Sequence, residues 1–209
     1  MKQSLKIKVC GLKDEANIFD VSSLSPDFLG FIHYPKSKRF VGTQFQLPNL
    51  PLSQKKVAVL VNEPLESAIQ IFHQGYDFLQ IHGDESPEYC QQLNNENIPI
   101  IKAFGITENF NFSTLIPYQS YTKIFLFDTK SPQYGGTGKK FNWNTLKNYT
   151  LNTPFLLSGG ITKNDAKTIL QLNHSQLIGV DLNSGFEIAP GIKNIEDLTF
   201  FTQNFKKSV

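Results

Sequence analysis

The sequence lacks the features of several large classes of protein. It has only two cysteines, Cys10 and Cys90, so it cannot hold a disulfide framework, and their spacing is not that of metal ligands. No apolar run approaches the length of a membrane span. Charged and apolar residues alternate over residues 6–9, a segment without the apolar core of a signal peptide. We therefore expect a cytoplasmic protein with reduced thiols, no metal and no membrane partner.

The sequence also has no large excess of positive or negative charge. The formal net charge is +2, and the lysines are scattered from Lys2 to Lys207 instead of gathered on one helix or arm. This distribution argues against nucleic acid as the main partner. Hydrophobic residues make up 40% of the 209 positions and charged residues 18%, which is typical of a folded globular protein.

Short apolar runs recur along the chain and predict eight β-strands. They cover residues 6–10, 28–33, 57–61, 78–82, 99–104, 123–128, 155–158 and 177–182. Several are almost continuously apolar, as strands buried on both faces of a parallel sheet are. Helical periodicity appears between them, for instance at 64–72 and 165–170. The alternation is compatible with an open doubly wound sheet or a closed barrel, and eight units favour one α/β domain over residues 1–209, a (β/α)8 TIM barrel.

Two of the intervals between strands do not fit a regular helix. Pro48 and Pro51 interrupt residues 43–54, and Pro117 interrupts residues 107–120. Proline removes a backbone donor and clashes with the preceding turn, so it breaks a helix interior. We expect the second and fifth helices to be short or irregular.

In such a barrel the functional groups lie at the carboxyl ends of the strands and on the loops that follow. Glycine-rich segments stand there after the seventh and eighth strands, at Ser158-Gly159-Gly160 and Asn183-Ser184-Gly185. Glycine lets backbone N–H groups approach an anion, so these loops indicate a phosphate site. They could also serve only as tight turns, but two such loops together favour a phosphorylated ligand.

Two strands end in side chains that can move protons, Cys10 and Asp128. A thiolate at the mouth of a barrel can act as a base, although an arbitrary cysteine is more often a buried small hydrophobe, the class to which we assign Cys90. A carboxyl group at the tip of an apolar strand can carry a proton. It can also cap a turn through Thr129 or pair with a lysine such as Lys102.

Other polar residues at the strand ends are expected to line the site. Asp181 lies in the eighth strand, and His82, which ends the fourth, is interpreted as part of the site wall. The glycines of 134–139, including Gly136, do not fit the frame of a nucleotide-binding P-loop and are expected to form a loop that closes over a ligand. No dinucleotide-binding fingerprint occurs in the sequence.

Several motifs, in order, resemble the phosphoribosylanthranilate isomerase family. They are Lys8-Val9-Cys10-Gly11, Tyr34-Pro35-Lys36-Ser37-Lys38-Arg39, Val59-Leu60-Val61-Asn62, Leu79-Gln80-Ile81-His82-Gly83-Asp84-Glu85, Asp128-Thr129-Lys130, Tyr134-Gly135-Gly136-Thr137-Gly138-Lys139, Leu157-Ser158-Gly159-Gly160 and Pro190-Gly191-Ile192-Lys193. The resemblance is collinear from residue 6 to about residue 200. It implies a cofactor-free barrel isomerase of tryptophan biosynthesis.

The resemblance also implies roles for single residues. Cys10 would be the thiolate base and Asp128 the general acid, while Arg39 would bind the anthranilate carboxylate. The phosphate would rest on the backbone of two segments, Gly159-Gly160 and Asn183-Ser184-Gly185. The implied reaction is an Amadori rearrangement of N-(5-phosphoribosyl)anthranilate to 1-(2-carboxyphenylamino)-1-deoxyribulose 5-phosphate, a small-molecule reaction for a monomer or homodimer.

The sequence departs from the family pattern at three points. Leu12-Lys13 replaces the usual Ile-Thr, so we expect Asp14 to take over the cap of the first helix. Asn183 stands where a serine is common, and Asn194 where an aspartate is usual. These changes bear on the details of phosphate binding and not on the reaction.

Two other kinds of function are compatible with a phosphate-binding barrel, namely another isomerase of a phosphorylated sugar and a protein that binds a phosphorylated ligand without catalysis. An epimerase-like enzyme would need a metal-binding set of His and Asp, and a histidine-pathway isomerase pairs aspartates at the first and fifth strands, whereas here the first strand ends in Cys10. A barrel that only binds a phosphorylated ligand would have no need of both Cys10 and Asp128.

Overall fold

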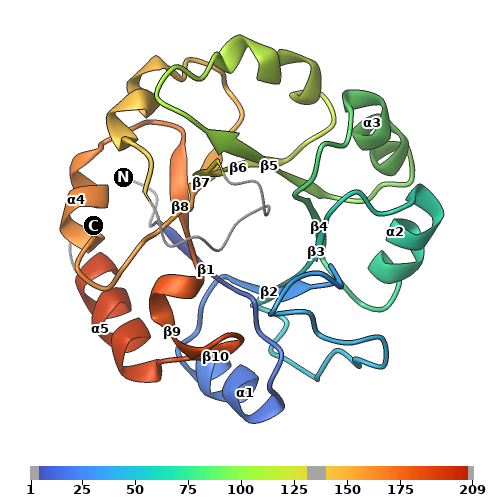
Figure 1. The fold of residues 1–209 in the computed structure, drawn as a ribbon, viewed down its shortest axis with the longest axis vertical. Coiled ribbons are helices and arrows are strands. Elements are labelled where there is room, and N and C mark those ends of the chain that lie inside the picture. The colour runs from blue at the N-terminus through green and yellow to red at the C-terminus, as the bar shows by residue number, and fades with distance from the viewer. Residues whose placement is uncertain (1–4, 131–139, 207–209) are drawn as a thin grey trace.

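The computed structural model describes residues 5–130 and 140–206, and its centre is a closed barrel of eight parallel strands (Figure 1). The strands are β1 (Lys6–Cys10), β2 (Phe28–Ile32), β3 (Lys55–Leu60), β4 (Phe78–Ile81), β5 (Ile100–Ile106), β6 (Ile124–Thr129), β7 (Phe155–Leu157) and β8 (Leu177–Leu182). Each strand pairs with the next one in sequence, and β8 pairs with β1, which closes the ring. The predicted (β/α)8 barrel and its eight strands are confirmed.

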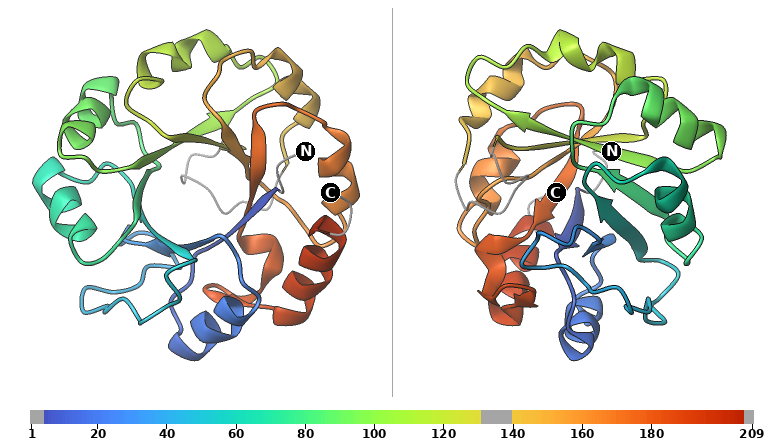
Figure 2. Two further views of the ribbon diagram at one scale, coloured as in Figure 1. Left: turned by 180° about the vertical axis from the view of Figure 1, so that it is seen from behind. Right: turned by 45° about the vertical axis from the view of Figure 1, so that its right-hand side comes forward.

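Helices form a ring outside the strands, and they keep this place in both views of Figure 2. They are α1 (Glu15–Ser23), α2 (Leu65–Phe72), α3 (Pro87–Asn95), α4 (Ala166–Gln171) and α5 (Ile195–Lys206), with the 3-10 helices η1 (Phe112–Tyr118), η2 (Trp143–Asn148) and η3 (Ser184–Phe186). A short antiparallel hairpin, β9 (Glu187–Ala189) and β10 (Ile192–Lys193), precedes α5. Within the described ranges, none of these helices has the length and apolar character needed to cross a membrane.

The second and fifth connections are irregular, as the prolines predict. The described residues between β2 and β3 contain no helix, and the connection after β5 holds only η1, which contains Pro117. In the connection after β6, the described residues from 140 onward hold the 3-10 helix η2 and no α-helix, which the sequence pattern did not indicate. Where proline is absent, local pattern alone did not separate the two kinds of helix.

The first helix starts as expected. Asp14 caps α1, and its side chain accepts a hydrogen bond of 2.9 Å from the backbone N–H of Asn17. Glu15 follows in the first turn, where a negative charge interacts favourably with the helix dipole. The cap fixes the point at which the chain leaves the barrel mouth after β1.

Alternate residues of the strands face two separate apolar layers. The smaller layer fills the barrel and consists of Phe28, Val57, Ile101, Ala103, Ile124, Leu126 and Leu156. The larger layer lies between strands and helices and includes Phe125 and Phe127. Because Ile124 and Leu126 face inward, Asp128 continues the inward face of β6.

The aromatic cluster outside β6 should contribute much of the stability. Phe127 is fully buried, and its ring centroid lies 4.8 Å from that of Phe155 and 5.1 Å from that of Tyr149. We expect Phe127→Ala to lower the free energy of unfolding by about 3–5 kcal/mol, because it leaves a cavity among packed rings. Urea denaturation followed by circular dichroism measures this change. Phe19→Ala on α1, where the side chain is 46% exposed, is the control; similar losses in the two variants would contradict the assignment.

Candidate active site

Cys10 and Asp128 lie at the same end of the barrel. Cys10 is the last residue of β1 and Asp128 the last but one of β6, and both are buried. Because all eight strands are parallel, both residues stand at the carboxyl-terminal mouth. Going round the ring from β1 to β6 on the shorter side, only β8 and β7 intervene.

Asp181, on the intervening strand β8, has polar contacts with β1 and with the residue that follows β7. Lys8 Nζ, on β1, donates a hydrogen bond of 2.8 Å to Asp181 Oδ1 on β8, and Ser158 Oγ donates one of 3.3 Å to Asp181 Oδ2. Directly after Ser158, a Cβ added to Gly159 would lie 3.0 Å from Asp128 Oδ1. The structure thus brings the predicted site residue Asp181 between the two candidate catalytic groups.

The thiol of Cys10 is surrounded by charged groups. Burial raises its pKa, the ammonium groups of Lys8 and Lys193 lower it, and the carboxylate of Asp181 raises it again, so that the net shift is upward. The other cysteine lies in a helix outside the barrel and not at the end of a strand. Cys90 is buried within α3, where burial raises its pKa to about 12, and it stays a packing residue.

The side chain of Arg39 lies against Gly11, the residue that follows Cys10. Its Nε and Nη2 donate to both carboxylate oxygens of Glu187 over 2.6–3.0 Å. A Cβ on Gly11 would lie 2.7 Å from both Arg39 Cδ and Asn183 Oδ1, so only glycine fits after Cys10, and its φ is +78°. Arg39 therefore lies beside the segment Cys10-Gly11 and is held by Glu187, a carboxylate that the sequence did not indicate.

Lys193 completes this charged cluster. Its Nζ donates to Glu187 Oε1 at 2.7 Å and to Asn183 Oδ1 at 2.8 Å. Burial lowers the Lys193 pKa, and Glu187 only partly opposes this. For Glu187 itself, burial raises the pKa, but the hydrogen bond from Arg39 and the charge of Lys193 hold it below its usual range.

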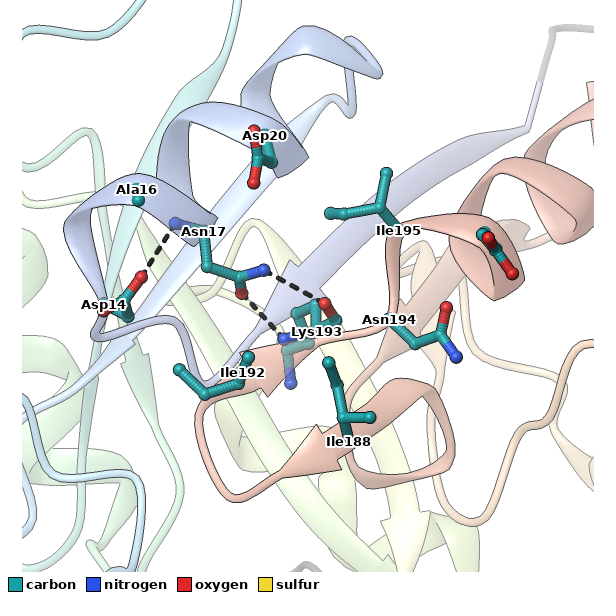
Figure 3. Close-up of a pocket in the computed structure, with 10 residues that line it drawn as sticks. Asp14, Ala16, Asn17, Asp20, Ile188, Ile192, Lys193, Asn194 and Ile195 are labelled. Atoms are coloured by element: carbon teal, nitrogen blue, oxygen red, sulfur yellow. Dashed lines mark hydrogen bonds between the residues drawn. The ribbon is translucent and has the colours of Figure 1, made fainter.

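The backbone of Lys193 is fixed from outside the barrel by α1. Asn17 Nδ2 donates to the Lys193 carbonyl oxygen at 3.0 Å, and the Lys193 N–H donates to Asn17 Oδ1 at 2.7 Å, as Figure 3 shows. The groove around this contact runs between α1 and the β9–β10 hairpin, and neither Cys10 nor Asp128 lines it. The contact between Asn17 and Lys193 thus holds the backbone of a residue whose side chain reaches the charged cluster, while the groove itself is distinct from the barrel mouth.

Asp128 has two neighbours that orient its carboxyl group. Its Oδ1 accepts a hydrogen bond of 2.7 Å from the backbone N–H of Thr129, and its Oδ2 lies 3.6 Å from His82 Nε2. The other ring nitrogen of His82 is 2.8 Å from Gln80 Nε2. If the Gln80 amide nitrogen donates, the imidazole proton sits on Nε2 and points toward Asp128. His82 thus lies beside Asp128, and its place in the wall of the substrate site stays a prediction.

Lys102 does not take part in this arrangement. It is buried, and its Nζ contacts Glu85 Oε2 at 3.1 Å and the Gly83 carbonyl oxygen at 2.8 Å. The alternative that pairs Lys102 with Asp128 is therefore wrong, because Lys102 faces the helix layer near Tyr118 and fixes the loop after β4.

The two glycine-rich loops lie against their neighbours closely. Gly159 and Gly160 have φ of +89° and +64°, and a side chain at Gly159 would collide with Thr129 Oγ1. A side chain at Gly185 would collide with the carbonyl oxygen of Ile161. The loops after β7 and β8 are thus in contact. Ser184 begins η3, which lies in the loop after β8 and leads into the β9–β10 hairpin. Close packing explains these glycines and is compatible with a phosphate site.

Three charged residues of the site escaped sequence reasoning, namely Lys8, Glu187 and Lys193. Lys8 and Lys193 belong to motifs that carry the family resemblance. A lysine two positions before Cys10 in a predicted strand was the feature of the sequence that could have indicated Lys8 as a site residue. Glu187 bonds to Arg39 from 148 positions away, which no local pattern reveals. The predicted site residue Gly136 and the glycine-rich segment around it lie outside the described residues.

Comparison with known proteins gives the family. A family model described as N-(5'-phosphoribosyl)anthranilate (PRA) isomerase matches residues 7–204. A protein of Parabacteroides distasonis named N-(5'-phosphoribosyl)anthranilate isomerase is 44% identical over 202 residues, which cover 94% of this chain and 91% of that protein.

Solved structures agree in fold. The crystal structure of phosphoribosyl anthranilate isomerase from Thermotoga maritima aligns with a TM-score of 0.82 and 28% identity over 97% of this chain and 99% of that one. Another phosphoribosyl anthranilate isomerase, solved in complex with reduced 1-(o-carboxyphenylamino)-1-deoxyribulose 5-phosphate, aligns with a TM-score of 0.78 and 24% identity over 97% and 99% of the two chains. Because the family match spans nearly the whole chain, this protein belongs to the phosphoribosylanthranilate isomerases, the isomerase family of tryptophan biosynthesis.

Proposed function

We propose that this chain converts N-(5-phosphoribosyl)anthranilate to 1-(2-carboxyphenylamino)-1-deoxyribulose 5-phosphate with Asp128 as the acid and Cys10 as the base. The observation that carries the proposal is the shared position of the two groups, both inward-facing at one mouth of one barrel. The reduced 1-(o-carboxyphenylamino)-1-deoxyribulose 5-phosphate held by a protein of the same fold supports the class of ligand.

The reaction needs one proton given and one proton taken. Asp128 protonates the ribose ring oxygen, the C1–O bond breaks, and the nitrogen lone pair forms a Schiff base. Cys10 then removes the proton from C2, which gives an enolamine that tautomerises to the ketone. The Nε2 of His82, 3.6 Å from Asp128 Oδ2, is placed to stabilise the carboxylate once its proton has left.

The charged groups at the mouth suit the two anionic ends of this substrate. Glu187 binds Arg39 through Nε and Nη2, so Nη1 is the amino group that these bonds leave for the anthranilate carboxylate. The phosphate would bind at the loops after β7 and β8, on the backbone of Gly159, Gly160, Asn183, Ser184 and Gly185.

The proposal extends to the setting of the enzyme. We expect one domain over residues 1–209 that acts in the cytoplasm as a monomer or homodimer, binds a small phosphorylated substrate, and needs neither nucleic acid nor a membrane. The scattered lysines and the modest net charge of +2 support this.

The activity itself is tested by fluorescence. Purified protein mixed with freshly made phosphoribosylanthranilate should abolish the fluorescence of the anthranilate compound as the rearranged product forms. Unchanged fluorescence, with a known isomerase active in the same buffer, would reject the proposed reaction.

The two catalytic assignments are tested by near-isosteric changes. Cys10→Ser and Asp128→Asn should each lower kcat by about a hundredfold or more, because each removes a proton-transfer group. Circular dichroism checks that the fold is kept. Cys90→Ser is the matched control, since Cys90 is equally buried but lies within α3. If kcat stays near normal in Cys10→Ser, the base is another residue.

The pH dependence follows from the raised pKa of the thiol. Burial holds the pKa of Cys10 above its usual range, so the thiolate is a minor species at neutral pH and its fraction rises with pH. We therefore expect kcat/KM to increase between about pH 7 and pH 9, since kcat/KM reports ionisation of the free enzyme. Steady-state rates at low substrate concentration measure this. A flat or falling profile over that range would argue against a thiol base.

A further inference from the structure

Strand β1 carries a buried cation that the proposed reaction does not use. Lys8 and Cys10 are two residues apart in the strand, so both side chains point into the barrel. Lys8 is 0% exposed. A lysine is almost never fully buried unless it is paired, and a pair in the wall of an active site can serve more than stability.

The ammonium of Lys8 and the thiol of Cys10 share a space beside Gly30. Gly30 is the ladder partner of Cys10 on β2. A Cβ added to Gly30 would lie 2.8 Å from Cys10 Sγ and 3.1 Å from Lys8 Nζ. The two atoms can therefore be no more than 5.9 Å apart, the sum of those distances. At this range an ammonium favours the anionic form of its neighbour.

We propose that Lys8 is a positioning residue that stabilises the thiolate form of Cys10, and that Gly30 keeps open the space in which the two side chains meet. The proposal rests on the proposed function only in taking Cys10 as the base.

The charges around Cys10 leave room for one more anion. Five charged side chains form ion pairs around Cys10. The cations are Lys8 on β1, Arg39 in the loop after β2 and Lys193 in the β9–β10 hairpin. The carboxylates are Asp181 on β8 and Glu187 in the hairpin. Three positive charges stand against two negative ones, so a thiolate at Cys10 would make this buried cluster neutral. A buried cluster is more stable when its charges balance.

Lys8 remains charged in these surroundings. Burial lowers its pKa, but the charges of Asp181 and Cys10 more than offset this, and the net shift is upward. Asp181 thus has two opposite effects, because it keeps Lys8 protonated and also disfavours the thiolate. Lys8 is the largest single influence that lowers the Cys10 pKa against burial.

A purely structural role for Lys8 would also explain its burial. In that case the pair with Asp181 would only join β1 to β8, and its loss would reduce stability without changing the chemistry of the thiol. The reactivity of Cys10 therefore separates the two roles, and it can be measured without substrate.

The experiment uses the full chain with Cys90→Ser, in which Cys10 is the one cysteine left. The rate of alkylation by iodoacetamide, followed at Cys10 by mass spectrometry, is measured as a function of pH. Lys8→Met should slow alkylation about tenfold at a fixed pH below the midpoint, which corresponds to a rise of about one pKa unit. The pH profile of kcat should move upward by a similar amount, with KM little changed.

Lys6→Met is the matched control. Lys6 lies on the same strand and the same face, but its Nζ sits over the ring of Phe28, 5.6 Å from the centroid, and away from Cys10. It should leave the alkylation rate unchanged. Equal rates in the folded Lys8→Met and Lys6→Met proteins would overturn the proposal.

Two further variants guard against loss of fold. Lys8→Met leaves Asp181 buried and unpaired, which can destabilise the protein. Asp181→Asn removes the carboxylate that opposes the thiolate and should speed alkylation, and adding Lys8→Met to it should slow alkylation again. Failure of the second change to slow the reaction would also overturn the proposal.

Gly30→Ala tests the space without removing a charge. Its Cβ would push Sγ and Nζ apart, so alkylation at a fixed pH should slow, and an unchanged rate would overturn the role of Gly30. These readings do not depend on turnover. If the fluorescence assay fails while alkylation responds to Lys8→Met, only the proposed function is rejected; if the assay succeeds and alkylation does not respond, only this inference is.

Discussion

The ion pair between Lys8 and Asp181 is the interaction on which the site depends. It joins the first and last strands of the barrel through a hydrogen bond of 2.8 Å. Lys8 and Asp181 lie two positions before Cys10 and Asn183, respectively. Taking two charges out of water has a large desolvation cost, so such a pair persists only with good geometry and further hydrogen bonds. Ser158 supplies one of these. Gly159, the next residue, lies close to Asp128 because a Cβ built on it would be 3.0 Å from Asp128 Oδ1. The ion pair that closes the ring therefore stands between the strand of Cys10 and the loop that packs beside Asp128.

Arg39, Glu187 and Lys193 form a second group of ion pairs at the barrel mouth. Glu187 lies just beyond β8 and binds both Arg39, from the loop after β2, and Lys193, from β10. Each cation is thereby held by a carboxylate, and Asn17 on α1 fixes the backbone of Lys193. The irregular second connection contributes to this, since a chain without a helix there can turn back over Gly11 and deliver Arg39 to the mouth.

The sequence predicted those features of the fold that depend on a local pattern of residues. Apolar runs predicted the eight strands, and Pro117 marked the fifth connection as irregular. The position of Cys10 and Asp128 at strand ends indicated a proton-transfer role independently of the family resemblance. The sequence did not reveal pairings between distant positions, such as Glu85 with Lys102 or Glu187 with Arg39. Lys8 was missed for a different reason: a strand that alternates charge with apolar residues suggests one face toward water, whereas here the charged face lines the barrel.

The opposing influences on Cys10 have a chemical logic. A general base works best when its pKa is near the operating pH, because a higher pKa makes the base stronger but leaves less of it ionised. Burial alone would leave almost no thiolate at the barrel mouth, and Lys8 reduces that penalty. Lys8 can do so only while it is itself protonated, and the carboxylate of Asp181 favours its protonated form. The carboxylate of Asp181 thus disfavours the thiolate directly and favours the cation that stabilises it, so the two members of the pair act on Cys10 in opposite directions.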